Sequence, residues 1–514
     1  MKFHESLIDG ARRYPDHVAL HWIDRDKRLT YAQAVEQMER VAAGLASLGV
    51  QRGDRVGIFA HNGLDYVLAM YGAWRLGAIS AHINVQYADT LDYFLNDCTP
   101  KVLIYTHDHL ATINRHRAAC PSVQHYVCFD GRQDGAIDWS ELIATPGPAP
   151  SVDFDDAEGA HLSYTSGTSG RPKGALIGHE PTHRACRCIA ERLGFDHQDV
   201  TYGASTLSSS YHLVANLLPG IHAGATVGIA TRWDAAKAWD AMERQGSTVL
   251  PSNATALAEL LEHCRSRGAA PGRLRLAVSG GGPVPPTVKR AFRDELKLPL
   301  AESYGQTELG GFVGLGPARL PDEEKLLACG PSLPDRHARI VDPITGQDVP
   351  TGEVGDIAVG GGHMLGYWGR PEQTAQVVRQ GYLYTGDVGR MDAEGYVYVR
   401  GRSSERLMVQ GEAWYPRDVE EALMEQQAVA SAALIGLPDG AGEDRPVAYV
   451  ILRDGIAVAE AQLLQAAGQR VKRDLSRLEL RCVDRLPLTP TGKISKAELK
   501  AEALQAAGGA MHPG

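Results

Sequence analysis

Residues 164–174 have the sequence YTSGTSGRPKG, which holds three glycines, four Ser or Thr side chains and one lysine. The run just before it, residues 161–164, is expected to end a strand. Glycines let backbone N–H groups converge on an anion, hydroxyls donate further hydrogen bonds, and lysine adds positive charge. Pro172 before Lys173 and Gly174 after it distinguish this stretch from the common P-loop. Alone, it is equally consistent with a flexible surface turn.

Four further motifs follow along the chain: ESYGQTE at 302–308, YTGD at 384–387, GR at 401–402 and PLTPTGKI at 487–494. The order and spacing of the five motifs resemble the adenylate-forming superfamily, which includes acyl-CoA synthetases, adenylation domains and firefly luciferase. The resemblance is strongest to the AMP-forming acyl-CoA synthetases and extends from about residue 14 to residue 500. Five linked motifs in this order are very unlikely by chance, so the sequence indicates the superfamily.

Composition limits the other possibilities. A chain of 514 residues is long enough for two or three domains. Its net charge of −10 argues against a nucleic-acid-binding surface. The N-terminal residues lack the apolar region of a signal peptide, and no apolar run of membrane-spanning length is present. We therefore expect a cytoplasmic enzyme with reduced thiols and no membrane partner.

Helical and strand patterns alternate through the first two thirds of the chain. Apolar residues at helical spacing predict a helix over 31–48. Further helices are expected at 64–76, 235–245, 254–263 and 286–295, and strands at 55–60, 101–105, 248–250 and 274–279. Such alternation predicts α/β layers around parallel sheets. The loop at Thr165 would then lie at a strand end, where α/β sheets usually bind ligands.

The pattern changes after about Gly355, where the expected strands come closer together. Strands are expected at 355–359 and 396–400, followed by a compact α+β unit with helices at 416–424 and 459–473 and strands at 429–437 and 445–452. We predict a domain boundary near 401–404. Residues 1–402 would form a large multi-sheet α/β domain that binds AMP and the acyl group, and residues 403–514 a small mobile α+β lid that carries Lys493.

The resemblance implies a reaction in two halves. A carboxylate attacks the α-phosphorus of ATP to give an acyl-adenylate and pyrophosphate, and a thiol, usually that of coenzyme A, then displaces AMP. The carboxylate is already a nucleophile, so positioning and charge stabilisation must supply most of the catalysis. The implied partners are a small carboxylic acid, ATP with Mg²⁺, and coenzyme A as co-substrate.

The same resemblance assigns roles to individual residues. Lys493 would bridge the carboxylate and the α-phosphate, Thr307 would bind the α-phosphate, and Glu308 would be the magnesium ligand. Tyr304 would lie against adenine, Asp387 would accept the ribose hydroxyls, and Arg402 would bind the ribose or phosphate. The full set of predicted ATP-binding residues is Thr165, Ser166, Gly167, Thr168, Ser169, Gly170, Lys173, Gly281, Glu302, Tyr304, Asp387 and Arg402.

The chain departs from the family pattern around the acyl and thiol sites. The usual Pro-Leu-Phe-His run is replaced by TLSSSYH at 206–212, so either Tyr211 and His212 are a shifted aromatic/His pair or a serine replaces the histidine. The hinge residue is Ser404 instead of Asp or Lys, and Gln410 replaces the first of two glycines. The predicted acyl-pocket residues are Ser210, Tyr211, His212, Gly282, Val284, Gly305 and Phe312, and the predicted coenzyme A residues are Gln410 and Gly411.

We therefore predict an ATP-dependent acid–thiol ligase that makes an acyl-CoA through an acyl-adenylate. No aspartate occurs between residues 202 and 231 to bind an α-amine, which disfavours an amino-acid substrate. The mixed pocket suits a fatty, alicyclic or aryl acid. Two alternatives stay open: an adenylating enzyme that loads a carrier-protein thiol, and a nucleotide-binding pseudoenzyme.

Overall fold

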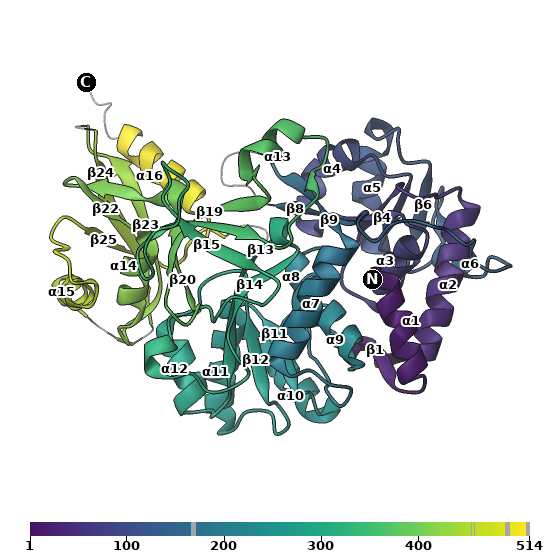
Figure 1. Cartoon of the computed structure of the whole chain (residues 1–514), viewed down its shortest axis with the longest axis horizontal. Helices are drawn as coiled ribbons and strands as arrows, with labels where there is room; N and C mark the ends of the chain where they lie inside the picture. Colours follow the sequence, from purple (N-terminus) through teal and green to yellow (C-terminus); the bar gives the residue numbers. More distant parts are fainter. Residues whose placement is uncertain (166–170, 441, 454, 457, 489–493, 510–514) are drawn as a thin grey trace.

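The computed structural model describes residues 1–165, 171–440, 442–453, 455–456, 458–488 and 494–509. It has the predicted architecture, a large N-terminal α/β part and a small C-terminal α+β part. Figure 1 shows the C-terminal part in yellow-green on one side and the N-terminal helices in purple at the opposite end.

The largest sheet has eight strands in the order β17-β9-β8-β4-β3-β5-β6-β7. The six strands from β8 to β7 are parallel, whereas β9 and β17 are antiparallel to their neighbours. Its carboxyl edge therefore carries the ends of β8, β4, β3 and β5 together. The strands are β3 (Arg55–Phe59), β4 (Ile79–His82), β5 (Val102–Tyr105), β6 (His125–Cys128), β7 (Ile137–Asp138), β8 (Gly159–Thr165), β9 (Lys173–Gly178) and β17 (Gly366–Tyr367).

Helices cover this sheet, and among them are the two predicted at 31–48 and 64–76. α2 (Tyr31–Ser47) begins at an N-cap threonine, Thr30, whose side chain accepts a hydrogen bond from Gln33 N. α3 (Leu64–Arg75) is buried along almost its whole length, which explains its apolar composition on every side. α1 (Phe3–Arg13) packs on α2 and α3, and α7 (His179–Leu193) follows β9 directly.

A second sheet, in the order β11-β12-β13-β14, ends where the ESYGQTE motif lies. β11 (Val249–Ser252), β12 (Leu276–Ser279) and β13 (Leu300–Gln306) are parallel, and β14 (Gly311–Leu315) returns antiparallel to β13. Its helices are α10 (Ala235–Gln245), α11 (Ala254–Arg267) and α12 (Pro286–Asp294), which share one apolar core with β11, β12 and β13.

A third sheet carries the remaining nucleotide motifs. β15 (His337–Val341), β16 (Gly355–Gly360), β19 (Tyr382–Met391) and β18 (Val378–Arg379) follow one another in it, and β20 (Val397–Arg402) also pairs with β19. The pairing sets Asp387 of β19 opposite Arg402 of β20. A smaller sheet near the N-terminus combines β1 (Val18–Trp22), β2 (Lys27–Thr30) and β10 (Val227–Ile229).

The C-terminal part has its own core. The hairpin of β21 (Leu407–Val409) and β22 (Glu412–Trp414) leads into α14 (Pro416–Met424), and a three-stranded sheet follows. Its elements are β23 (Val429–Pro438), β24 (Asp444–Leu452), β25 (Glu479–Cys482), α15 (Glu460–Val471) and α16 (Lys496–Gly509). None of the helices in the described part of the chain combines the length and apolar character needed to span a bilayer.

Candidate active site

Two antiparallel strands close the base of the glycine-rich loop. β8 ends at Thr165 and β9 begins at Lys173, and these two residues pair across the strands. The hydroxyl of Thr165 lies 3.5 Å from the carbonyl oxygen of Lys173. The predicted residues Ser166, Gly167, Thr168, Ser169 and Gly170 lie outside the described residues, so the structure places the two ends of the loop.

Tyr367 connects the end of this loop with Glu308. The Nζ of Lys173 lies 4.8 Å from the centroid of the Tyr367 ring, a cation–π distance. The Tyr367 hydroxyl donates to Oε1 of Glu308 at 2.9 Å. Burial and the Glu308 carboxylate raise the pKa of Tyr367, so the phenol stays protonated as a donor. The predicted phosphate-loop lysine and the predicted metal ligand are therefore joined through one tyrosine.

Ser210 and Thr307 were predicted for different parts of the site, and the structure brings them together. Their hydroxyl oxygens lie 2.9 Å apart. Ser210 begins the short helix α8 (Ser210–His212), and Thr307 begins the 3₁₀ turn η6 (Thr307–Leu309) directly after β13. The contact joins the predicted acyl pocket to the residue predicted to bind the α-phosphate.

A buried hydrogen-bond network surrounds Asp387, which is 6% exposed. Its Oδ2 accepts from the Tyr304 hydroxyl and from Nε2 of Gln306, each at 2.7 Å. Its Oδ1 lies 3.0 Å from Nε of Arg402, whose Nη1 also donates to the Thr385 carbonyl oxygen at 2.9 Å. Burial and the adjacent Asp387 raise the pKa of Tyr304. Three predicted nucleotide-binding residues thus meet at one carboxylate.

Sequence reasoning missed two members of this site. Gln306 lies inside the ESYGQTE motif, so its position was visible, but its contact with Asp387 depends on how the second and third sheets meet. Tyr367 lies in no sequence motif. It belongs to β17, and the pairing of β17 with β9 places its side chain beside Lys173 and Glu308.

Two aromatic rings come from the segments that hold the Ser210–Thr307 contact: Tyr211 follows Ser210, and Phe312 of β14 pairs with Gly305, two residues before Thr307. The ring centroids of Tyr211 and Phe312 are 6.0 Å apart. The Tyr211 hydroxyl donates to the carbonyl oxygens of Ser252 and Val278, at 3.0 and 2.8 Å, which fixes the ring. A Cβ atom on Gly280 would lie 2.4 Å from Cε2 of Tyr211, so glycine is needed there for the close approach.

The other glycines predicted near adenine and the acyl group differ in their surroundings. Gly281 and Gly282 are exposed, and Gly281 has a φ of +85°, which favours glycine. A Cβ atom on Gly305 would lie 2.5 Å from the carbonyl oxygen of Gly311. Val284 is 1% exposed and packs within the apolar core of the second sheet.

His212 points into the core. Its Nδ1 lies 2.7 Å from the Ser205 carbonyl oxygen, and its Nε2 lies 3.0 Å from Nδ2 of Asn216. Burial lowers the pKa of His212 to about 4, so the imidazole is neutral. Of the two alignments that the sequence left open, this geometry favours the one in which a serine occupies the active-site position, because Ser210 and not His212 contacts Thr307.

The side chain of Glu302, which was predicted to bind ATP, contacts two cationic side chains of α12 and α14. It forms an ion pair with Lys289 of α12, and its Oε1 lies 3.4 Å from Nη2 of Arg417 in α14. Arg417 also donates from Nε to Glu421 at 2.6 Å. Because Arg417 belongs to the C-terminal part, this buried ionic cluster connects the two parts of the chain.

The predicted coenzyme A residues form the turn of the β21–β22 hairpin. Gln410 and Gly411 have φ angles of +54° and +74° and are exposed. Their backbone N–H groups donate to the two carboxylate oxygens of Glu443, at 2.7 and 2.8 Å. A two-residue hairpin turn with positive φ at both positions favours glycine or asparagine, so Gln410 occupies a strained position. Lys493 lies outside the described residues.

Comparison with known proteins agrees with this arrangement. Residues 7–368 match the family model described as "AMP-binding enzyme", and residues 418–493 match the model described as "AMP-binding enzyme C-terminal domain". A feruloyl-CoA synthase from an Amycolatopsis species is 32% identical, over 92% of this chain and 93% of the relative. An indoleacetate–CoA ligase from Aromatoleum aromaticum is 30% identical, over 97% and 98% of the two chains.

Solved structures show the same fold over the whole length. The anthranilate CoA ligase AuaEII in complex with anthranoyl-AMP superposes with a TM-score of 0.90 at 27% identity, covering 99% of this chain and 98% of that one. The predicted superfamily, fold class and enzyme class are therefore confirmed. The chain belongs to the AMP-binding enzyme family, and it is an ATP-dependent, AMP-forming acyl-CoA ligase.

Proposed function

We propose that the acid activated by this ligase is an aromatic carboxylic acid. The observation that carries the proposal is the pair of rings, Tyr211 and Phe312, in the segments that hold the Ser210–Thr307 contact. Because the Tyr211 hydroxyl is already bound to two carbonyl oxygens, its ring offers an apolar surface. Aromatic rings prefer offset or edge contacts with other aromatic rings. Relatives whose names specify ferulate, indoleacetate and anthranilate support the same class of acid.

The first half-reaction forms one bond and breaks one. A carboxylate oxygen of the acid attacks the α-phosphorus of ATP, and the bond to the β-phosphate oxygen breaks to release pyrophosphate. Two anions must approach each other, so hydrogen-bond donors and positive charge have to be in place beforehand. We assign Thr307 to the α-phosphate, the loop from Thr165 to Lys173 to the β- and γ-phosphates, and Lys493 to the junction of carboxylate and phosphate.

The nucleoside would be held from the third sheet. Asp387 and Arg402 would bind the ribose, and the backbone at Gly281 together with Tyr304 would border the adenine. Gly281 is exposed and has a positive φ of +85°, and both features support this assignment. Binding at Asp387 would have to share a carboxylate that already accepts from Tyr304 and Gln306.

Mg²⁺ fits the site at Glu308. This carboxylate is half-buried next to Thr307, and Tyr367 holds one of its oxygens at a fixed position. Carboxylate oxygen is the ligand that Mg²⁺ prefers beside phosphate oxygens. When bound, the ion would neutralise charge on the phosphates of ATP.

In the second half-reaction the sulfur of coenzyme A attacks the acyl carbon, the thiol proton is lost, and AMP leaves with the bonding electron pair. We assign the hairpin turn at Gln410 and Gly411 to the thiol entrance. The alternatives left open by the sequence, a carrier-protein thiol and a pseudoenzyme, gain no support from relatives named as CoA ligases. A cytoplasmic location stays a prediction.

Pyrophosphate release over a panel of acids tests the proposal. Aromatic acids should give higher kcat/KM values than aliphatic acids of similar size. Phe312→Leu should raise KM for the aromatic acid and leave KM for ATP unchanged. The control is Phe195→Leu, because Phe195 follows the C-terminal end of α7 and packs against the main apolar core, and this variant should change neither KM. A preference for aliphatic acids would refute the substrate class. Lys493→Ala should lower the adenylation rate by about 10²–10³, as for other charge-stabilising donors.

A further inference from the structure

Two histidines and one aspartate meet at the carboxyl ends of the neighbouring parallel strands β3 and β5. His61 comes two residues after the end of β3, and Asp108 and His109 belong to the 3₁₀ turn η3 (His107–His109) that follows β5. The strand register pairs Phe59 with Tyr105, so the two segments leave the sheet side by side. In the sheet order, β8 with its phosphate loop is separated from β3 by β4.

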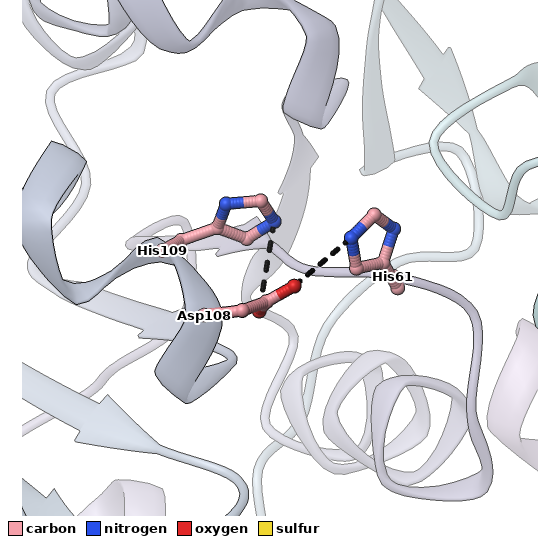
Figure 2. A group of neighbouring side chains, drawn as sticks. All are labelled: His61, Asp108 and His109. Atoms are coloured by element: carbon pink, nitrogen blue, oxygen red, sulfur yellow. Dashed lines mark ion pairs between the residues drawn. The ribbon is translucent and has the colours of Figure 1, made fainter.

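The three side chains point toward one another. Figure 2 shows both imidazole rings directed at the carboxylate of Asp108. Nε2 of His61 lies 3.1 Å from one carboxylate oxygen, and Nε2 of His109 lies 3.8 Å from the other. One ligand atom from each residue falls within 4.8 Å of the other two. Zinc sites have metal–ligand distances of about 2.0–2.2 Å, which puts neighbouring ligand atoms about 3.4 Å apart. Small side-chain rotations would reach that geometry.

His109 supplies an unused ligand atom. Its Nε2 is buried and has no hydrogen-bond partner among the described residues, because 3.8 Å to Asp108 is too long for a hydrogen bond. An imidazole nitrogen without a hydrogen-bond partner can present its lone pair to a metal ion.

The backbone around these ligands is fixed. Asp130 accepts from the N–H of His107 at 2.6 Å, and the N–H of His109 donates to the Thr106 carbonyl oxygen at 3.0 Å. Asn62, next to His61, makes three hydrogen bonds, to Ser205, Leu207 and Ala230. Ligands anchored in this way lose little conformational freedom when they bind an ion.

We infer that His61, Asp108 and His109 form a binding site for a divalent transition-metal ion of the Zn²⁺ class. Two imidazole nitrogens and one carboxylate oxygen suit such ions and disfavour Mg²⁺ and Ca²⁺, which prefer oxygen ligands alone. Three protein ligands leave the fourth position of a tetrahedral ion open to water. The site is independent of the proposed aromatic substrate.

One neighbouring group competes with the metal. Nη2 of Arg232 lies 3.4 Å from Nε2 of His61, the atom that would bind the ion. Arg232 is exposed, so its side chain can turn into solvent when the ion enters. The positive charge of Arg232 lowers the affinity of the site for a cation. Arg232→Gln should therefore bind Zn²⁺ more tightly than the parent protein.

Calorimetric titration with Zn²⁺ tests the site in the tag-free, full-length chain after treatment with EDTA and desalting. A Cys482→Ser background removes the exposed cysteine as a competing ligand. His61→Gln and His109→Gln are the test variants, and His107→Gln, in the same turn but outside the cluster, is the matched control. Visible absorption of bound Co²⁺ reports imidazole coordination independently, and circular dichroism of the metal-free variants checks that they fold.

The parent protein and His107→Gln should each bind one more Zn²⁺ per chain than His61→Gln and His109→Gln, or bind it at least about 10-fold more tightly, as expected when a ligand is lost. The Co²⁺ absorption should disappear in the same two variants. Equal Zn²⁺ binding by the parent and both folded test variants would overturn the assignment, as would a parent protein that binds no Zn²⁺.

Discussion

Replacement of Glu302 by glutamine distinguishes two roles for this residue. The sequence assigned Glu302 to the ATP site, whereas the structure buries its carboxylate between Lys289 and Arg417. The three residues are 4%, 5% and 9% exposed, so solvent cannot screen their charges. Glu302→Gln keeps the shape of the side chain and removes its charge. The variant therefore leaves two buried cations without their shared counter-ion.

The expected loss of stability follows from the partners that remain. Removal of one member of a buried ion pair costs about 3–5 kcal/mol. Arg417 keeps its bond to Glu421 at 2.6 Å, and Lys289 keeps the Leu326 carbonyl oxygen at 2.9 Å. The amide oxygen of glutamine also remains as an acceptor. We therefore expect the lower end of the range, about 3 kcal/mol, with most of it arising at Lys289.

Denaturant unfolding followed by both fluorescence and circular dichroism measures this loss, because a chain with two cores can unfold in more than one step. Lys289→Met alone and in combination with Glu302→Gln completes a double-mutant cycle. Removal of both charges should recover at least half of the stability lost in Glu302→Gln. A variant of unchanged stability but strongly raised KM for ATP would refute the structural role and support direct contact with the nucleotide.

Three further predictions concern individual side chains of the site. Asp387→Asn should raise KM for ATP roughly 10- to 100-fold, since a hydrogen bond to a charged group contributes about 1.5–3 kcal/mol; an unchanged KM would exclude it from ribose binding. Gly280→Ala should displace the ring of Tyr211, cost about 1–3 kcal/mol in unfolding experiments and lower kcat/KM for the aromatic acid more than for ATP. His212 takes up its proton near pH 4 in the folded state and near pH 6.5 in the unfolded state. As the pH falls across that interval the unfolded state binds the proton first, so the free energy of unfolding decreases by roughly 3 kcal/mol. His212→Gln should flatten the stability–pH curve there, and parallel curves would contradict the assigned burial.

Sequence patterns predicted the elements whose signal is local. The helices at 235–245 and 416–424 have the expected bounds because their apolar positions recur at helical spacing and a cap or a proline marks the start. The strand at 429–437 extends by one residue in the structure. The sheet of β1, β2 and β10 was not predicted, because β1 pairs with a strand about two hundred residues away and neither is long enough to stand out.

Within the site, motifs identified residue types but not their partners. Tyr304 and Asp387 were both predicted to contact the nucleotide, and nothing in either motif indicates that their side chains bind each other at 2.7 Å. Glu302 was assigned with its motif, although alternate residues of a strand point to opposite faces. Its carboxylate faces Lys289, a contact that depends on α12 packing against β13.

The lone pairs of Asp387 limit how ribose can bind. A carboxylate offers about four acceptor positions, two on each oxygen. Tyr304 and Gln306 occupy both positions on Oδ2, and Arg402 occupies one on Oδ1. One ribose hydroxyl can therefore bind without displacing any protein donor, but a second requires Arg402 to yield its position. Arg402 ends the last strand of the large sheets, directly before the segment that leads to the C-terminal part. Binding of both ribose hydroxyls would therefore displace the side chain of Arg402, which lies at the junction between the two parts of the enzyme.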